Sequence, residues 1–137
     1  MATINDLLKA ILMDRFKQGI RSQYPEYYLI AALELHTFSS LNENFLPLYK
    51  DSMNEADTAC VYFNPHTLAH KKLPPLTAEK IKHFFNNETL NVFNDSAKLK
   101  TYIIEKAKQH QKTLNILLMS SGNFDGIVFE ELANSIF

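Results

Sequence analysis

The stretch Y-L-I-A-A-L-E-L, from Tyr28 to Leu35, is apolar at nearly every position. A strand with one face in water would show polar residues at every second position, so this run predicts a strand that is buried on both faces. Strands of that kind occur in parallel sheets that carry helices on both sides. The stretch therefore indicates an α/β fold.

Further strands and helices alternate along the rest of the chain. Apolar residues at helical spacing predict an amphipathic helix from about Asp6 to about Ser22, with Gly19 and Pro25 as stop signals. The other predicted strands are Ala59–Phe63, Leu90–Phe93 and Leu114–Met119. The other clear helices begin at Thr77, at Asp95 or Ser96, and near Phe129. We expect a single α/β domain over residues 1–137, with a mainly parallel sheet flanked by helices.

Two connecting segments are harder to assign. Ser40 and Glu43 have the spacing of a capping box, which predicts a helix through about Met53, kinked or restarted at Pro47. The segment from Asn64 to Leu76 contains three prolines, and we expect it to be a long surface loop.

Composition limits the class of protein. The 137 residues suffice for one core without disulfide bonds, and the single cysteine, Cys60, lies in an apolar run. One cysteine fits a reducing compartment, so we expect a cytoplasmic protein. The net charge of −1 gives no reason to expect nucleic acid as a partner, and no apolar run is long enough for a membrane span.

The stretch S-S-G-N-F-D-G, from Ser120 to Gly126, holds two of the three glycines of the chain. Gly122 would let the backbone adopt a positive φ or approach a ligand closely. Ser120, Ser121 and Asn123 offer hydroxyl and amide groups that suit a carboxylate or amide ligand. The alternative is a tight strand-to-helix connection whose glycines serve geometry alone.

A second polar motif, E-L-H-T-F-S-S, closes the strand Tyr28–Leu35. Glu34 and His36 are two residues apart, so both side chains can point to one side of the sheet. A histidine beside a carboxylate can carry positive charge near neutral pH and bind an anion. We interpret His36 as a candidate binding residue and the two serines as helix caps. Both polar motifs follow strands, and ligands of parallel sheets bind at the carboxyl ends of strands.

Other sites of chemistry are poorly supported. His66 and His70 are four residues apart, but no Glu of the metalloprotease pattern accompanies them, and we expect a solvated basic loop with Lys71 and Lys72 rather than a metal site. The alternative is that this loop meets carboxylates or phosphates of a substrate. Neither a phosphate-binding glycine loop nor a nucleophile–base pair is recognisable, so we assign no catalytic residue, no metal ligand and no cofactor to this chain.

The order of motifs resembles the C-terminal domain of the Mur ligases, in particular their murein-peptide recycling branch. The resemblance rests on L-I-A-A-L-E-L-H-T-F-S-S-L-N-E-N-F-L-P-L-Y, on Ala56–Asp57, on V-Y-F-N-P and on L-L-M-S-S-G-N-F-D-G. It covers roughly residue 24 to the C-terminus. The resemblance implies a Rossmann-like three-layer domain that binds the incoming amino acid or peptide of an ATP-dependent, amide-forming ligase acting on UDP-N-acetylmuramate.

Specific residues follow from the resemblance. Ser120, Ser121, Gly122, Asn123 and Phe124 match the loop that lines the peptide pocket in the family, and His36 and Thr37 stand where it places polar or basic residues. ATP and magnesium belong to the central domain of such ligases, and the UDP-sugar to a further domain. The family's D-F-A-H-x-P-like motif is missing, since this region reads I-N-D-L-L-K-A-I-L-M-D. We therefore expect residues 1–23 to be a divergent N-terminal helix.

Two hypotheses about function therefore stand. The chain is the substrate-binding domain of a ligase of peptidoglycan biosynthesis or recycling, inactive in isolation, or it is a stand-alone α/β binding module that kept the fold and lost the chemistry. A G-K-T-T phosphate loop upstream in the same reading frame would favour the ligase.

Overall fold

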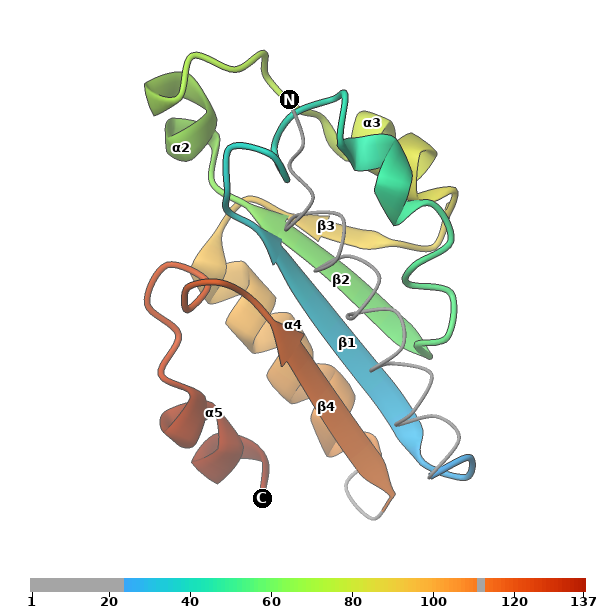
Figure 1. Cartoon of the computed structure of the whole chain (residues 1–137). Helices are drawn as coiled ribbons and strands as arrows, with labels where there is room; N and C mark the ends of the chain where they lie inside the picture. The colour runs from blue at the N-terminus through green and yellow to red at the C-terminus, as the bar shows by residue number, and fades with distance from the viewer. Residues whose placement is uncertain (1–23, 111–112) are drawn as a thin grey trace.

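Four parallel strands form the centre of the structure, a computed structural model that describes residues 24–110 and 113–137 (Figure 1). The strands are β1 (Tyr28–Leu35), β2 (Thr58–Phe63), β3 (Asn91–Phe93) and β4 (Leu114–Met119), and their order across the sheet is β3-β2-β1-β4. All three strand pairs are parallel. The helix predicted between Asp6 and Ser22, together with Gly19, lies outside the described residues.

Helices cover both faces of this sheet. The 3-10 helix η1 (Leu46–Tyr49), α2 (Pro65–His70) and α3 (Ala78–Phe85) lie on one side, and α4 (Ser96–Lys108) and α5 (Phe129–Ile136) lie on the other. The predicted three-layer, Rossmann-like α/β fold is confirmed.

The central strand β1 contributes to both cores, as its uninterrupted apolar run predicts. Leu29, Ala31 and Leu33 pack into the core under η1 and α3, while Ile30 and Ala32 pack into the core under α4 and α5. All are at most 2% exposed, so β1 has no face in water. Any polar side chain on this strand is consequently buried and needs a partner from elsewhere in the chain.

The strand order creates a topological switch point beside β1. From β1 the chain moves outward through β2 to β3, and then crosses back to place β4 on the opposite side of β1. The connections that leave the carboxyl ends of β1 and β4 therefore diverge to different sides. In open α/β sheets this crevice is where ligands bind.

Two helices begin at the cap residues that the sequence predicts. The Asp95 carboxylate accepts from the Lys98 N–H at 3.1 Å and begins α4, and the Thr77 hydroxyl accepts from the Lys80 N–H at 3.2 Å and begins α3. These caps satisfy backbone donors that have no partner within the helix.

Two connecting segments differ from the prediction. No α-helix follows Ser40: the chain runs through turns to η1, because the Thr37 hydroxyl accepts from the Ser40 N–H at 3.1 Å, and Glu43 pairs with Lys80 at 3.1 Å instead of closing a capping box. Pro47 stands in the first turn of η1, where its missing N–H costs nothing.

The segment predicted as a loop after Asn64 begins with the short helix α2. The Asn64 side chain accepts from the His66 N–H at 2.8 Å, and Pro65 occupies the first helical turn. Proline here opens a helix instead of preventing one. Within the described part of the chain, no helix is long and apolar enough to cross a membrane.

The packing of α4 against the sheet gives a direct test of this fold. Ile103 is fully buried between α4 and the strands, so Ile103→Ala should lower the free energy of unfolding by about 2–5 kcal/mol. Thr101→Ala, on the exposed side of the same helix, should change it by no more than about 0.5 kcal/mol. Urea unfolding followed by circular dichroism measures both, and equal losses would contradict the placement of α4.

Candidate functional site

The two polar motifs meet at the switch point, around the buried side chain of Glu34. Its carboxylate is 2% exposed and lies near the carboxyl end of β1. One oxygen, Oε1, accepts from the Ser120 hydroxyl and, at 2.9 Å, from the Phe124 N–H. A buried charge needs such partners, because moving it out of water without them is costly. The carboxylate therefore fixes the loop after β4 to the end of β1.

His36 lies on the same side of the sheet, as the two-residue spacing predicts. Its Nδ1 is 3.6 Å from Glu34 Oε2 and is buried without a hydrogen bond among the described residues, while the whole imidazole side chain is 43% exposed. The ring thus places one edge against the carboxylate and leaves part of its surface to solvent. A ligand at the crevice can meet the exposed part.

The backbone of the loop after β4 is unusual, but not at the expected glycine. Phe124, Asp125 and Gly126 have φ values of 56°, 57° and 110°. Gly122 lies outside the left-handed region, and a Cβ there would meet Glu34 Oε1 at 3.5 Å, an ordinary contact. Of the two roles expected for Gly122, a positive φ is therefore not adopted, and a close approach to a ligand stays a prediction; among the described glycines only Gly126 has a positive φ.

Three further contacts hold this left-handed segment. The Asp125 carboxylate accepts from the Tyr62 hydroxyl at 2.5 Å and from the Asn64 amide at 3.0 Å, and the Ser96 hydroxyl donates to the Phe124 carbonyl at 2.6 Å. Burial, followed by the hydrogen bond to Asp125, raises the pKa of Tyr62 well above its usual range. The tyrosine therefore remains a neutral donor to the loop at physiological pH.

The hydrogen bonds of this loop divide the predicted site residues into two groups. Ser120 is bonded to Glu34 and accepts from the Gly122 N–H at 2.8 Å, and the ring of Phe124 is fully buried, so both face inward. Thr37 is engaged in the turn with Ser40. Their side chains are engaged within the protein, so these residues can position the loop for a ligand.

The second group faces solvent. Ser121, Gly122 and Asn123 are exposed at the tip of the loop. The Asn123 side-chain oxygen accepts from the Gly126 N–H at 3.1 Å. The oxygen is thus used within the loop, and the amide nitrogen is left to donate to a ligand. With His36, the tip offers hydroxyl, amide and imidazole groups on a fixed backbone. Such a set can bind carboxylate or amide groups, and it contains no activated nucleophile.

Sequence reasoning missed the anchors Tyr62, Asn64, Ser96 and Asp125. Tyr62 is paired in register with Glu34 on the neighbouring strand, and Asn64 follows the end of β2. Asn64 could have been identified from the sequence, because it is a polar residue directly after a predicted strand, where site residues of parallel sheets gather. The bond from Ser96 depends on where α4 begins in space, which no local pattern reveals.

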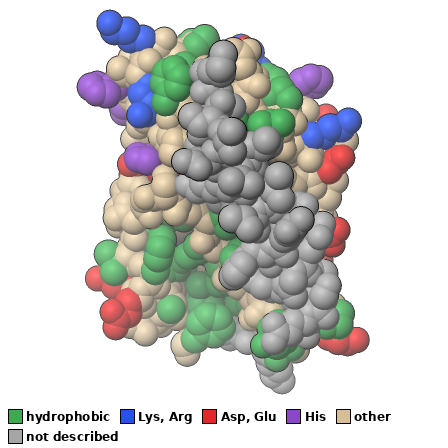
Figure 2. Space-filling view, in the orientation of Figure 1, with side chains coloured by type: hydrophobic (Ala, Val, Ile, Leu, Met, Phe, Trp, Pro, Cys, Tyr) green, Lys and Arg blue, Asp and Glu red, His purple; other side chains and the backbone are tan. Residues whose placement is uncertain are grey.

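Basic residues border this end of the sheet. His66, His70 and Lys72 are exposed on or just after α2, beyond the carboxyl end of β2, and Figure 2 shows lysine and histidine side chains gathered there. No group of three or more potential metal-ligating side chains occurs within residues 24–110 and 113–137. Positive charge near the crevice favours an anionic ligand.

Comparison with solved structures identifies one similar domain. It comes from a protein of Haemophilus ducreyi 35000HP described as a UDP-N-acetylmuramate:L-alanyl-gamma-D-glutamyl-meso-diaminopimelate ligase, with a TM-score of 0.57 and 18% sequence identity over 93% of this chain and 84% of that one. Neither a family model nor a curated protein matches the sequence. The likeness shows a shared fold, in agreement with the resemblance derived from the motifs.

Removing the Glu34 carboxylate tests whether this side chain anchors the loop after β4. In Glu34→Ala the Ser120 hydroxyl and the Phe124 N–H lose their acceptor, so we expect the free energy of unfolding to fall by about 2 kcal/mol or more. Glu34→Gln keeps an oxygen of the same reach and should lose less. Urea unfolding gives the stabilities, and amide hydrogen exchange at Phe124 should accelerate most in the alanine variant. Unaltered exchange at Phe124 would contradict the assignment of Glu34 as the anchor.

The Tyr62–Asp125 bond predicts a pH dependence. The unfolded chain loses the Tyr62 proton near pH 10, whereas the folded protein keeps it to higher pH, so the free energy of unfolding falls as the pH rises above about 10. Tyr62→Phe should make the fall of the free energy of unfolding with pH less steep, by up to the contribution of one proton released on unfolding. Tyr102 and Cys60, whose pKa values burial also raises, remain in both proteins and cancel in the difference. Identical slopes between pH 9 and 11 would refute the shift.

Proposed function

We propose that this chain is the peptide-binding domain of an ATP-dependent ligase that joins a peptide to UDP-N-acetylmuramate. The observation that carries the proposal is the hydrogen-bonded loop at the switch point, which exposes Ser121 and Asn123 at the edge of the sheet where His36 contacts Glu34. The similar domain from Haemophilus ducreyi, which is described as part of such a ligase, has the same fold. By this proposal the chain corresponds to the C-terminal domain of that enzyme class and works in the cytoplasm.

The chemistry of the substrate fits the exposed groups. A peptide of the type L-alanyl-γ-D-glutamyl-meso-diaminopimelate carries several free carboxylates, which neutral N–H and O–H donors and a histidine can bind. Lys71 and Lys72, directly after α2, add positive charge on the same rim. Recognition of the peptide thus requires no chemistry from this chain: its residues hold and orient the substrate.

Bond formation requires groups that this chain is not proposed to supply. ATP and Mg²⁺ would be bound by the central domain of such a ligase, and the UDP-sugar by a further domain. The amine of the peptide would attack an acyl phosphate of the muramyl carboxylate, displacing phosphate and forming an amide. We expect no ATP hydrolysis by the isolated chain, because it has no glycine-rich loop with a lysine for the phosphates.

The second candidate is a stand-alone binding module. It is favoured by the absence of the D-F-A-H-x-P-like motif from the sequence. Such a module would bind the same class of anionic peptide through the same loop, and it would not be fused to an ATP-binding domain. The upstream reading frame distinguishes the two candidates.

The peptide-binding assignment predicts a specific loss of affinity. Titration of the chain with L-alanyl-γ-D-glutamyl-meso-diaminopimelate should perturb the NMR signals of Ser121, Asn123 and His36. Asn123→Asp keeps the oxygen that accepts from the Gly126 N–H, removes the amide donor and adds a negative charge. It should raise the Kd at least about 10-fold, since a hydrogen bond to a charged group contributes about 1.5–3 kcal/mol.

Two controls make this result interpretable. Thr101→Ala lies on the outer face of α4 and should leave the affinity unchanged. A peptide whose carboxylates are replaced by amides should bind wild type more weakly and should be less sensitive to Asn123→Asp. Equal affinity of wild type and Asn123→Asp for the acidic peptide, with both proteins folded by thermal melting, would refute the pocket.

A further inference from the structure

The outer edge of β4 is open. Within residues 24–110 and 113–137, β4 pairs with β1 on one side and with no strand on the other. Its sequence, L-N-I-L-L-M, contains no charge and no proline. Edge strands of soluble monomers are commonly short, charged, bulged or interrupted by proline, which prevents pairing with other chains. The opposite outer strand, β3, is only three residues long. The longer and unprotected edge, on which another strand can pair, is therefore that of β4.

The backbone groups of three residues face this edge. The Tyr28 N–H donates to the Thr113 carbonyl at 2.7 Å, at the start of the ladder between β1 and β4. Because successive residues of a strand direct their backbone groups to alternate sides, Leu114, Ile116 and Leu118 turn theirs away from β1. These groups can form the ladder of an additional strand.

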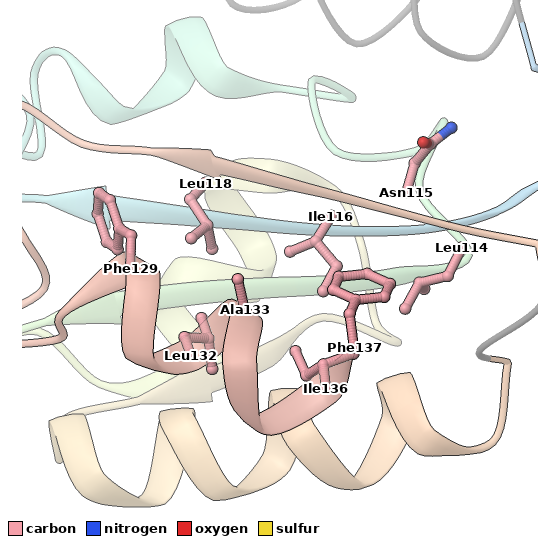
Figure 3. A pocket seen from close by; sticks show the side chains of 9 residues that line it. All are labelled: Leu114, Asn115, Ile116, Leu118, Phe129, Leu132, Ala133, Ile136 and Phe137. Carbon is pink, nitrogen blue, oxygen red and sulfur yellow. The ribbon is translucent and has the colours of Figure 1, made fainter.

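The same three residues line an apolar pocket with α5. The pocket has a volume of about 310 Å³, and Figure 3 shows Phe129 beside Leu118 at one end and Phe137 beside Leu114 and Ile116 at the other. Green side chains mark this region in Figure 2, over β4 and α5.

Exposed apolar side chains are concentrated on α5 and its ends. Among the described residues, six large hydrophobic side chains are exposed, and three of them are Val128, Phe129 and Phe137, at 50%, 42% and 75%. Two of these, Phe129 and Phe137, line the pocket beside the open strand. Clusters of this kind mark interaction surfaces.

We infer that a second copy of this chain covers this edge by antiparallel pairing of β4 with β4, centred on Ile116. In this register Ile116 lies opposite its counterpart and Leu114 lies opposite Leu118 of the partner subunit, so every outward-facing backbone group meets another. All of these side chains are uncharged, and no like charges oppose each other across the pair. The two sheets become one continuous sheet.

The register also brings the exposed aromatic residues together. Phe137 lies near the start of β4 and Phe129 near its end, on the same side of the sheet. Antiparallel pairing therefore places Phe137 of one copy opposite the partner's Phe129, beside both pockets. This contact removes from water the two phenylalanine side chains that α5 leaves exposed.

The full chain tests this inference by analytical ultracentrifugation. The wild type should show a mass that rises from the 15.8 kDa of one chain toward twice that value over roughly a hundredfold range of protein concentration. Phe137→Glu, at the most exposed of these positions, should raise the dimer Kd at least tenfold. Adding Phe129→Lys to Phe137→Glu should restore association, because opposite charges then face each other across the interface.

A matched control and a cross-linking experiment complete the test. Leu48→Glu introduces the same charge at another exposed large hydrophobic residue, on η1, and should leave the dimer unchanged. In a mixture of Phe137→Cys and Phe129→Cys chains, a short bis-maleimide should join position 137 to position 129, since burial raises the pKa of the Cys60 thiol to about 12 and keeps it unreactive. A monomer at every concentration, equal weakening by Leu48→Glu, or predominant 137-to-137 cross-links would overturn the inference.

Discussion

A carboxylate buried near the end of the central strand holds together the two polar segments at the carboxyl edge of the sheet. Glu34 stands on a strand that has no solvent-facing side, so its charge must be met by donors within the protein. The donors come from a loop some ninety residues later in the sequence, through Ser120 and the backbone of Phe124. The Glu34 side chain thus links formation of this loop to formation of the central strand.

The loop in turn adopts a backbone that most residues avoid. Two consecutive non-glycine residues, Phe124 and Asp125, have positive φ, a conformation that costs of the order of 1 kcal/mol each. Burial of the Phe124 ring and the bonds of Asp125 to Tyr62 and Asn64 offset that cost. The same contacts that stabilise the strained backbone turn Ser121 and Asn123 toward solvent, so the exposed donors are fixed before any ligand arrives.

Much of the fold follows from simple sequence patterns, and the exceptions have physical causes. The apolar runs predict β1 and β4 with their observed bounds, because runs of eight and six residues have the length of a strand and are short for a helix. The α-helix expected after Ser40 does not form, because the Thr37 hydroxyl accepts from the Ser40 N–H that a capping box would use, and Glu43 pairs with Lys80 instead. The proximity of the two polar motifs was predictable from parallel topology, whereas the left-handed segment at Phe124 depends on Glu34, Tyr62 and Ser96 together.

The proposed site and the proposed dimer use different parts of the same strand, and their geometry is compatible. The ligand groups lie beyond the carboxyl end of β4, whereas association uses its outer edge. Antiparallel pairing of two β4 strands directs their carboxyl ends in opposite directions, so the two crevices lie at opposite ends of the joined sheet. Each crevice then remains open to a ligand. Pairing would nevertheless stiffen the strand from which the loop departs, and this would favour a preorganised site without closing it.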